Sequence, residues 1–236
     1  MKSPKVHFIF TCEHAGYIVP KLLLNKVEIP QQVLSSHMGY DRGAQVLAKG
    51  LAKKCHGELF EFNITRLLID ANRSLNAKTL HSKYTKNLNK EEREFLVGKY
   101  LEYRETVGKS LKKSLEKNQK TFVFSIHTFT PRYKGQIRKT DIGILFRPKI
   151  KKENQLATEL KALLQDNCKK KWNIHLNRPY RGHTDCFLND LSDKYISHPR
   201  VTGLFLEANQ RILFKKEGEK ECLLAFSKSL RSLSIF

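Results

Sequence analysis

The chain has 236 residues and is strongly basic, with 44 lysines and arginines against 23 acidic residues and a formal net charge of +21. A length of this order and a hydrophobic content of 40% suit one domain with a full core, and they exclude a disordered chain. No apolar run approaches the roughly 20 residues that a membrane span needs. We therefore expect residues 1–236 to form a single catalytic domain.

The N-terminal segment is predicted to be a first strand, not a secretion signal. Lys2 and Lys5 precede the apolar residues 6–10, but this run is shorter than the ~7–15 residues of a signal's apolar region, and Glu13 and His14 follow it. The five cysteines are scattered without a C-x-x-C pair, which is typical of free thiols and not of a disulfide framework. Both features favour a cytoplasmic protein.

Strand-like and helix-like patterns alternate along the chain. In chain order we predict a strand at 6–10, a helix at 41–54, a strand at 58–64, a helix from 89 to 115, strands at 121–126 and 141–146, a helix at 153–167, strands at 172–176 and 202–206, and a helix at 217–233. Residues 67–70 either continue or bend the second strand. This alternation indicates an α/β fold with a mostly parallel, mixed central sheet and helices on both faces.

Chemically active side chains follow three of the predicted strands. Glu13 and His14 follow the first strand, His127 follows the strand at 121–126, and Glu207 follows the last core strand. If these strands are parallel, their carboxyl ends share the edge of the sheet where ligands of open α/β sheets bind. Two imidazoles and a carboxylate suit a catalytic zinc ion, and either Glu13 or Asp41 supplies the carboxylate. Glu207 would then act as the base.

Each of these residues also has a purely structural interpretation. A histidine at the end of a strand is commonly just hydrogen-bonded, Asp41 can cap the helix that follows it, and Glu207 can pair with an arginine. What favours a metal site is the joint occurrence of these residues at three strand ends.

Several arginines in turn-rich segments are candidates for binding a substrate. Guanidinium groups bind carboxylates through two parallel hydrogen bonds, so such a group beside a zinc ion would suit an acidic substrate. The segment from 177 to 185 is polar and contains glycine, as binding loops do. The candidate substrate-binding residues are Arg42, Arg66, Arg73, Asn177 and Arg181.

Other mechanisms fit the sequence less well. There is no G-x-S-x-G motif, and Cys12 has no clear activating partner. The positive charge predicts nonspecific binding of nucleic acid at low salt, but no recognition motif accompanies it. A non-catalytic polyanion-binding protein is the alternative outside the enzymes.

Seven motifs, in this order, resemble those of the N-formylglutamate amidohydrolase family. They are CEHAG at 12–16 with a following proline at 20, HMGYDRGA at 37–44, RLLIDANR at 66–73, SIHTFTP at 125–131, DIGILF at 141–146, NRPYRG at 177–182 and LEANQ at 206–210. The resemblance implies a zinc-dependent hydrolase with one zinc ion per chain. The implied fold is similar to that of zinc carboxypeptidases and zinc-dependent N-acetylmuramoyl amidases.

The resemblance also assigns roles to single residues. By the pattern of the amidases, His14, Asp41 and His127 are the metal ligands and Glu207 is the base. The carboxypeptidase pattern instead takes an acid close to the first histidine, which keeps Glu13 as an alternative ligand.

The implied substrate is a small acidic N-acyl amino acid such as N-formylglutamate. A peptidoglycan fragment or an acidic peptide is the alternative substrate for the same metal chemistry. One segment departs from the family, because the resemblance predicts an arginine near Asn209 and an acid near Arg211. The motifs therefore leave the exact amide substrate open, and they do not specify an oligomeric state.

Overall fold

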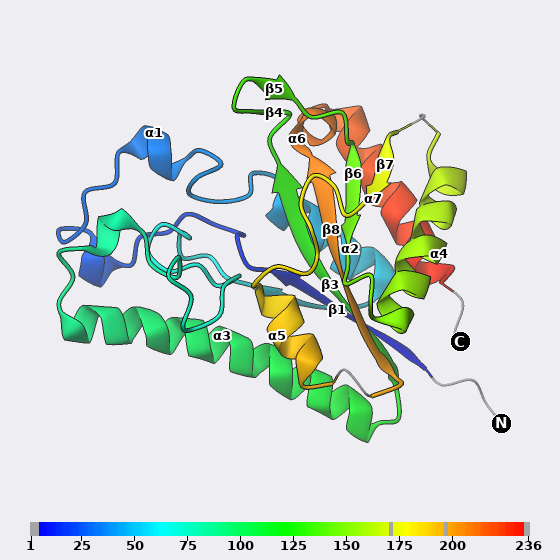
Figure 1. Ribbon diagram of the computed structural model, residues 1–236, viewed down its shortest axis with the longest axis horizontal. Helices are drawn as coiled ribbons and strands as arrows, with labels where there is room; N and C mark the ends of the chain where they lie inside the picture. Colours follow the sequence, from blue (N-terminus) through cyan, green and yellow to red (C-terminus); the bar gives the residue numbers. More distant parts are fainter. Residues whose placement is uncertain (1–4, 170–171, 196–197, 234–236) are drawn as a thin grey trace.

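A six-stranded sheet forms the centre of the computed structural model, which describes residues 5–169, 172–195 and 198–233 (Figure 1). In sheet order the strands are β2 Glu58–Glu61, β1 Val6–Cys12, β3 Lys120–Phe129, β8 Val201–Asn209, β6 Ile142–Leu145 and β7 Ile174–Leu176. All neighbouring strands pair in parallel except β6 and β8, which are antiparallel. The predicted mixed and mostly parallel sheet is confirmed.

Helices cover both faces of the sheet and bury a separate apolar cluster on each (Figure 1). The first face carries α2 Ala44–Cys55, α4 Lys151–Asn167 and α7 Lys216–Arg231, and the second carries α3 Lys90–Glu116 and α5 Phe187–Asp193. The remaining short elements are η1 Lys21–Leu23, α1 Gln31–Leu34, η2 Lys83–Thr85, α6 Gln210–Leu213 and the hairpin of β4 Arg132–Tyr133 and β5 Gln136–Ile137. The central strands β3 and β8 are buried along their whole length, as expected for strands covered on both faces.

The start of α3 shows how a local sequence signal fixes an element. The side chain of Asn89 accepts a hydrogen bond from the backbone N–H of Glu92, and the Glu92 carboxylate accepts one from the backbone of Asn89, both at 2.9 Å. These reciprocal bonds satisfy two donors that a helix start otherwise leaves unpaired. The helix that was predicted to start at residue 89 therefore begins where expected.

The reversed direction of β6 follows from its short connection. The segment between β3 and β6 holds only the β4–β5 hairpin, and a parallel return would need a crossover across the sheet. The chain therefore enters β6 at the same edge at which it leaves β3. This places residues 140–142 beside the carboxyl end of β8.

Residues 67–70 neither continue nor bend a strand, because they lie in a turn segment after β2 has ended. Leu68 and Ile69 are nevertheless fully buried, since this loop packs into the apolar cluster on the α3 face. All five cysteines are free thiols, as expected. Within the described ranges, none of the helices has the length and apolar character needed to cross a lipid bilayer.

Candidate active site and metal centre

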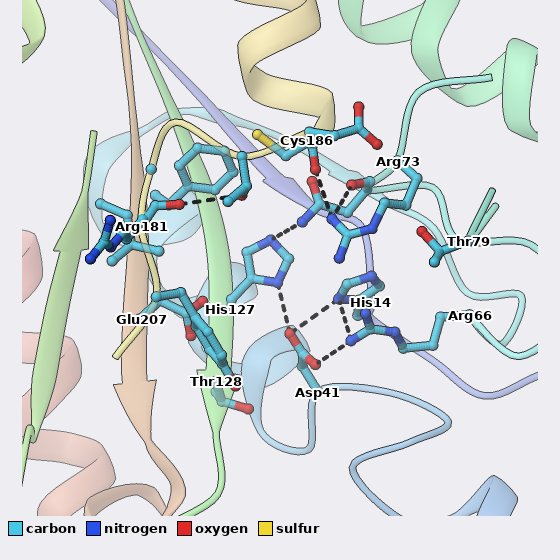
Figure 2. Close-up of a pocket in the computed structure, with 17 residues that line it drawn as sticks. His14, Asp41, Arg66, Arg73, Thr79, His127, Thr128, Arg181, Cys186 and Glu207 are labelled. Carbon is cyan, nitrogen blue, oxygen red and sulfur yellow. Dashed lines mark hydrogen bonds and ion pairs between the residues drawn. The ribbon is translucent and has the colours of Figure 1, made fainter. Parts of the chain in front are cut away.

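The carboxyl ends of β1, β3 and β8 meet at one edge of the sheet, as their parallel pairing requires. His127 on β3 lies directly opposite Glu207 on β8, and His14 comes two residues after the end of β1. All three side chains are buried, yet all three line one pocket of about 500 Å³ (Figure 2). The convergence that the sequence analysis assumed is therefore present.

Asp41 reaches the two histidines from the turn that precedes α2. Its backbone N–H donates to the carbonyl oxygen of His14 at 3.0 Å, which ties the two loops together. Gly43 has a φ of 91°, a conformation that favours glycine, and it turns the chain into the helix at Ala44. No side chain caps α2, so Asp41 does not have the capping role that the sequence also allowed.

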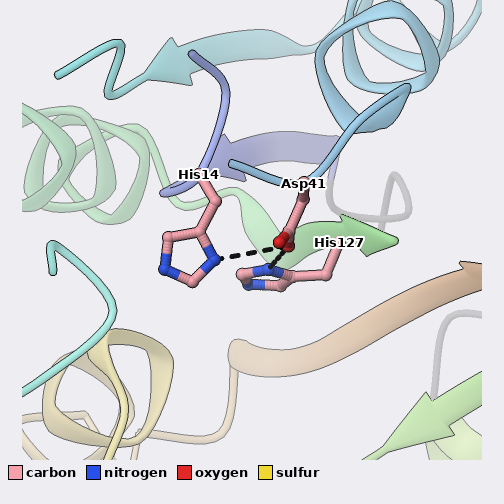
Figure 3. A group of neighbouring side chains, drawn as sticks. All are labelled: His14, Asp41 and His127. Atoms are coloured by element: carbon pink, nitrogen blue, oxygen red, sulfur yellow. Dashed lines mark hydrogen bonds and ion pairs between the residues drawn. The ribbon is translucent and has the colours of Figure 1, made fainter. Parts of the chain in front are cut away.

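His14, Asp41 and His127 form a compact group of donor atoms (Figure 3). Asp41 Oδ2 lies 3.3 Å from Nδ1 of His14 and 2.7 Å from Nδ1 of His127. One ligand atom from each of the three residues lies within 4.8 Å of the others. Two imidazole nitrogens and one carboxylate oxygen are the donor set of a catalytic zinc ion that keeps a coordination position open.

Each histidine also contacts a second buried carboxylate through its other nitrogen. Nε2 of His14 lies 2.7 Å from Oδ1 of Asp70, and Nε2 of His127 lies 3.0 Å from Oε2 of Glu13. Glu13 thus contacts the nitrogen of His127 that is not directed at Asp41. The carboxylate that joins the two histidines is Asp41.

The charges of this cluster favour a cation. Glu13, Asp41 and Asp70 supply three carboxylates, and Arg66 supplies one guanidinium that contacts Asp70 at 2.9 Å and Asp41 at 3.6 Å. With both imidazoles neutral, three negative charges against one positive charge leave a net charge of −2. A divalent metal ion balances this charge, so the residues present fit the zinc ion that the sequence motifs imply.

The pKa values of the cluster reflect the same charges. Burial alone raises the pKa of Glu13, but its contacts with His127 and Ser125 outweigh burial and lower the pKa to about 2. For Asp41, burial acts in the same upward direction, and the two histidines hold the pKa well below its usual range. For His127, burial lowers the pKa, and the contacts with Asp41 and Glu13 raise it well above the ordinary value.

Glu207 differs from the other acids of the site because one of its carboxylate oxygens lacks a hydrogen-bond partner among the described residues. Its Oε2 is buried and has no hydrogen-bond partner in the part of the chain that the structure describes. Burial raises the pKa of Glu207 to about 7, although the nearby His127 acts to lower it. A buried carboxylate with one unpaired oxygen and a pKa near neutral pH is suited to accept and return a proton.

Gly143 on β6 lies opposite Glu207 and lets a loop approach the site closely. A Cβ atom at this position would lie 2.2 Å from the carbonyl oxygen of Arg178 and 3.2 Å from Cβ of Glu207. Only glycine fits without a shift of the backbone. The loop that follows β7 can therefore pack against the sheet beside Glu207 and form a wall of the pocket.

The sequence places this site in a known family. A family model described as N-formylglutamate amidohydrolase matches residues 6–213, which is most of the chain. The chain belongs to the N-formylglutamate amidohydrolase family. A comparison of the sequence with curated proteins finds no match.

Solved structures agree at the level of the fold. A gene product of Agrobacterium tumefaciens matches with a TM-score of 0.75 and 21% identity, over 97% of this chain and 92% of that one. An N-acetylmuramoyl-L-alanine amidase from Clostridium difficile 630 gives 0.46 and 11%, over 97% and 96% of the two chains. One from Nostoc punctiforme gives 0.44 and 8%, over 95% of each. The match to the Agrobacterium tumefaciens protein shows a shared fold.

In this N-formylglutamate amidohydrolase family member, three of the five candidate substrate-binding residues line the pocket. They are Arg66, Arg73 and Arg181. The guanidinium of Arg66 is engaged by carboxylates, and Nη1 of Arg73 donates to the carbonyl oxygen of Asp185 at 2.7 Å. Arg181 makes no ion pair with any described residue and is exposed, so its charge is available to a ligand.

The other two candidates lie outside the pocket lining. The guanidinium of Arg42 lies over the ring of Phe214, 4.5 Å from its centroid. The side-chain oxygen of Asn177 accepts hydrogen bonds from the backbone N–H groups of Phe146 and Gly182, at 3.1 and 3.0 Å. Asn177 thus fixes the shape of the loop that carries Arg181.

Two residues at the pocket were not singled out from the sequence. Asp70 is a lone acid within the apolar stretch of the RLLIDANR motif, and that placement was the available signal. Tyr180 lines the pocket, and its hydroxyl accepts a hydrogen bond from Nη1 of Arg138 at 3.0 Å. Arg138 comes from the segment after the β4–β5 hairpin, far from Tyr180 in the sequence, so no local pattern joins them.

The segment that departs from the family pattern has a structural role here. Asn209 ends β8 and caps α6, because its side chain accepts a hydrogen bond from the backbone N–H of Arg211. Arg211 itself pairs with Asp141 at 2.7 Å. Neither side chain lines the pocket, so the substrate contacts of this chain must come from other residues.

Proposed function

We propose that this protein is a zinc-dependent amidohydrolase that cleaves the amide bond of a small acidic N-acyl amino acid. The observation that carries the proposal is the placement of His14, Asp41 and His127 in the same pocket as Glu207, whose buried oxygen is unpaired. Membership of the N-formylglutamate amidohydrolase family supports the type of bond.

The chain's own residues divide the chemistry among them. His14, Asp41 and His127 would hold the zinc ion, which when bound supplies a Lewis acid that lowers the pKa of water to about 7 and polarises a carbonyl group. Glu207 takes the proton from the attacking water and then gives it to the leaving nitrogen. A pKa of about 7 suits both transfers near neutral pH.

The substrate's carboxylate is assigned to the arginine side of the pocket. Arg181 offers a guanidinium that no described residue pairs, and Arg73 lies in the same lining. A guanidinium binds a carboxylate through two parallel, charge-assisted hydrogen bonds, so it fixes orientation as well as charge. The net charge of +21 adds a field that draws anionic substrates towards the protein.

The first test combines metal content and turnover. The purified protein is analysed for bound metals, and release of free amine is then measured with N-formyl and N-acetyl derivatives of glutamate, aspartate and alanine, before and after chelation. We expect about one zinc ion per chain, faster turnover of the acidic compounds, and loss of both zinc and turnover in His127→Ala. The matched control is His7→Ala, which changes a histidine of the same sheet outside the pocket lining.

A protein that takes up no zinc after dialysis against the ion would overturn the metal mechanism. Zinc uptake without turnover of any acidic compound would overturn the substrate class, and a peptidoglycan fragment or acidic peptide would then be tried with the same protein.

A further inference from the structure

Two buried carboxylates stand behind the candidate metal ligands, one for each histidine. We propose that Asp70 and Glu13 are positioning residues that hold His14 and His127 with Nδ1 towards the metal, and that Arg66 supports Asp70 and does not bind substrate. This inference rests on the proposed metal site. It assigns a role to Glu13, Asp70 and Arg66, which take no direct part in the proposed hydrolysis.

The two histidines present the same nitrogen to the same atom. Asp41 Oδ2 faces Nδ1 of both His14 and His127, and both Nε2 atoms face other carboxylates. A neutral imidazole carries its proton on one nitrogen and an electron pair on the other. A carboxylate at Nε2 keeps the proton there, so the electron pair of Nδ1 is directed at the metal position.

Asp70 makes the shorter of these two contacts and is itself held on several sides. Its Oδ1 accepts hydrogen bonds from Nε2 of His14 at 2.7 Å and from the backbone N–H of Asn72 at 3.0 Å. Its Oδ2 accepts one from Nη2 of Arg66 at 2.9 Å. Asp70 therefore has little freedom to turn away from His14.

Arg66 connects this support to the ligand carboxylate. One nitrogen of its guanidinium contacts Asp70, and the other lies 3.6 Å from Oδ1 of Asp41. The same guanidinium thus fixes the separation of two acids on either side of His14. Its charge is already matched by these acids, whereas that of Arg181 is not, so Arg181 and not Arg66 is the carboxylate anchor.

Glu13 is enclosed more completely than Asp70, with an exposed fraction of 1%. Ser125 donates to its Oε2 at 2.6 Å, and the hydroxyl of Tyr103 donates to its Oε1 at 3.1 Å. The same Oε2 lies 3.0 Å from Nε2 of His127. The side-chain nitrogen of Asn72 lies farther from Nε2 of His127, at 3.4 Å. Both oxygens of Glu13 are engaged by β3 and α3, which keeps the carboxylate behind His127.

Strand β1 provides an internal control for these contacts. His7 lies near its start, and Nε2 of His7 is 3.1 Å from Oε1 of Glu58, a distance close to that between His127 and Glu13. The side chain of Glu58 is 51% exposed, and neither residue lines the pocket. Glu58→Gln therefore changes the same kind of contact without touching the site.

The test measures zinc affinity, a readout that needs no substrate. Metal-free wild type, Asp70→Asn, Glu13→Gln and Glu58→Gln are titrated with zinc against a chromogenic chelator, and thermal unfolding of each metal-free protein reports folding. We expect Asp70→Asn and Glu13→Gln to bind zinc about 10- to 100-fold more weakly than wild type. Glu58→Gln should stay within about twofold. The absorption bands of the cobalt-loaded proteins should shift in the two site variants only.

Two further comparisons make the roles distinguishable. Arg66→Lys should weaken zinc binding several-fold and leave the KM for an acidic substrate nearly unchanged, whereas a substrate-binding role would raise KM at constant zinc affinity. If Glu13→Gln does not fold, Tyr103→Phe replaces it, because it removes one support of Glu13 and should weaken zinc binding by a smaller factor.

The outcomes separate this inference from the proposed function. Zinc affinities of Asp70→Asn and Glu13→Gln equal to that of wild type would overturn the positioning roles and leave the hydrolase intact. Loss of zinc in Glu13→Gln with normal binding in Asp41→Asn would make Glu13 the ligand and also overturn the inference. A wild-type protein that binds no zinc would instead overturn the proposed function itself.

Discussion

The candidate active site joins two kinds of scaffold, the central sheet and the loops at its edge. His127 and Glu207 lie opposite each other on neighbouring strands that are buried along their whole length. His14, Asp41 and Asp70 lie on loops that backbone hydrogen bonds hold in place, such as that from Asp41 to His14 at 3.0 Å. The comparison teaches that the sheet fixes the spacing of the candidate ligand His127 and the proposed base Glu207, while the loops supply the other candidate ligands.

One wall of the pocket, which carries the candidate arginines and Tyr180, belongs to the loop side. Arg181 and Tyr180 come from the segment between β7 and α5, and Arg73 comes from the loop after β2. Changes on the sheet side should therefore affect the rate of the chemical step. Changes in the wall should affect substrate binding.

The largest effect should come from the proposed base on the sheet side, Glu207. Glu207→Gln keeps the shape of the side chain but removes its ability to take a proton. We expect kcat to fall by about 10²- to 10⁴-fold, because that is the usual contribution of a general base. Zinc content should stay at the wild-type level, as measured by elemental analysis. A wild-type kcat in this variant would move the base to another residue and break the division between sheet and loops.

The next largest effect should be on the free energy of unfolding at acid pH, through the buried carboxylate of Glu13. The pKa of Glu13 is lowered from 4.5 to about 2 in the folded protein, so its contribution to stability is complete above pH 4.5 and is lost as the pH falls towards 2. For a side chain this buried, the contribution is of the order of 3 kcal/mol. Urea unfolding of metal-free protein between pH 7 and pH 3 measures it.

In this titration Glu13→Gln should be less stable than wild type at pH 7 and should lose less stability on acidification. Glu58→Gln, in which the lost carboxylate is largely exposed, should follow the wild-type curve. Parallel curves for wild type and Glu13→Gln would show that Glu13 is not held by its contacts in solution.

Substitutions in the loop wall of the pocket should change KM by a smaller factor. Arg181→Gln removes the unpaired guanidinium, and we expect KM for an acidic substrate to rise about 10- to 100-fold, because a hydrogen bond to a charged group contributes about 1.5–3 kcal/mol. The matched comparison is Arg42→Gln, since Arg42 packs on Phe214 outside the pocket lining. Its KM should stay within about twofold. The reverse result would support the original prediction for Arg42.

The smallest effect should come from the hydroxyl group of Tyr180. Tyr180→Phe keeps the ring that packs against Arg138 and removes the oxygen that Arg138 binds at 3.0 Å. The donor is a charged guanidinium, but the bond is exposed to solvent, so we expect kcat/KM to fall by only about 2- to 10-fold. A much larger fall confined to kcat would place Tyr180 with the reacting atoms.

The sequence predicted correctly those features of the fold and of the candidate site that depend on the local order of residues. Apolar runs predicted the core strands, and the helical pattern from residue 89 predicted the start of α3. His14 and His127 were found because each follows a predicted strand, and the parallel pairing of β1 with β3 then brings them together. These features depend on local order along the chain.

What the sequence could not supply depends on contacts between distant segments. The reversal of β6 is a property of the whole sheet, and the contact between Arg138 and Tyr180 joins residues 42 positions apart. The five candidate substrate-binding residues looked alike in the sequence. They differ in their partners, because the guanidinium of Arg42 lies over the ring of Phe214, whereas Arg181 makes no ion pair with any described residue.

The pairing of β3 with β8 predicts which part of the pocket loosens first when the protein is heated. Adjacent strands are spaced at about 4.7–4.9 Å by their hydrogen bonds, so the separation of His127 and Glu207 can change only if the centre of the sheet opens. Loops open at lower free energy than central strands do. As the temperature rises, the wall with Arg181 should therefore loosen first, and an ageing or heated sample should lose selectivity between substrates before it loses the ability to transfer protons.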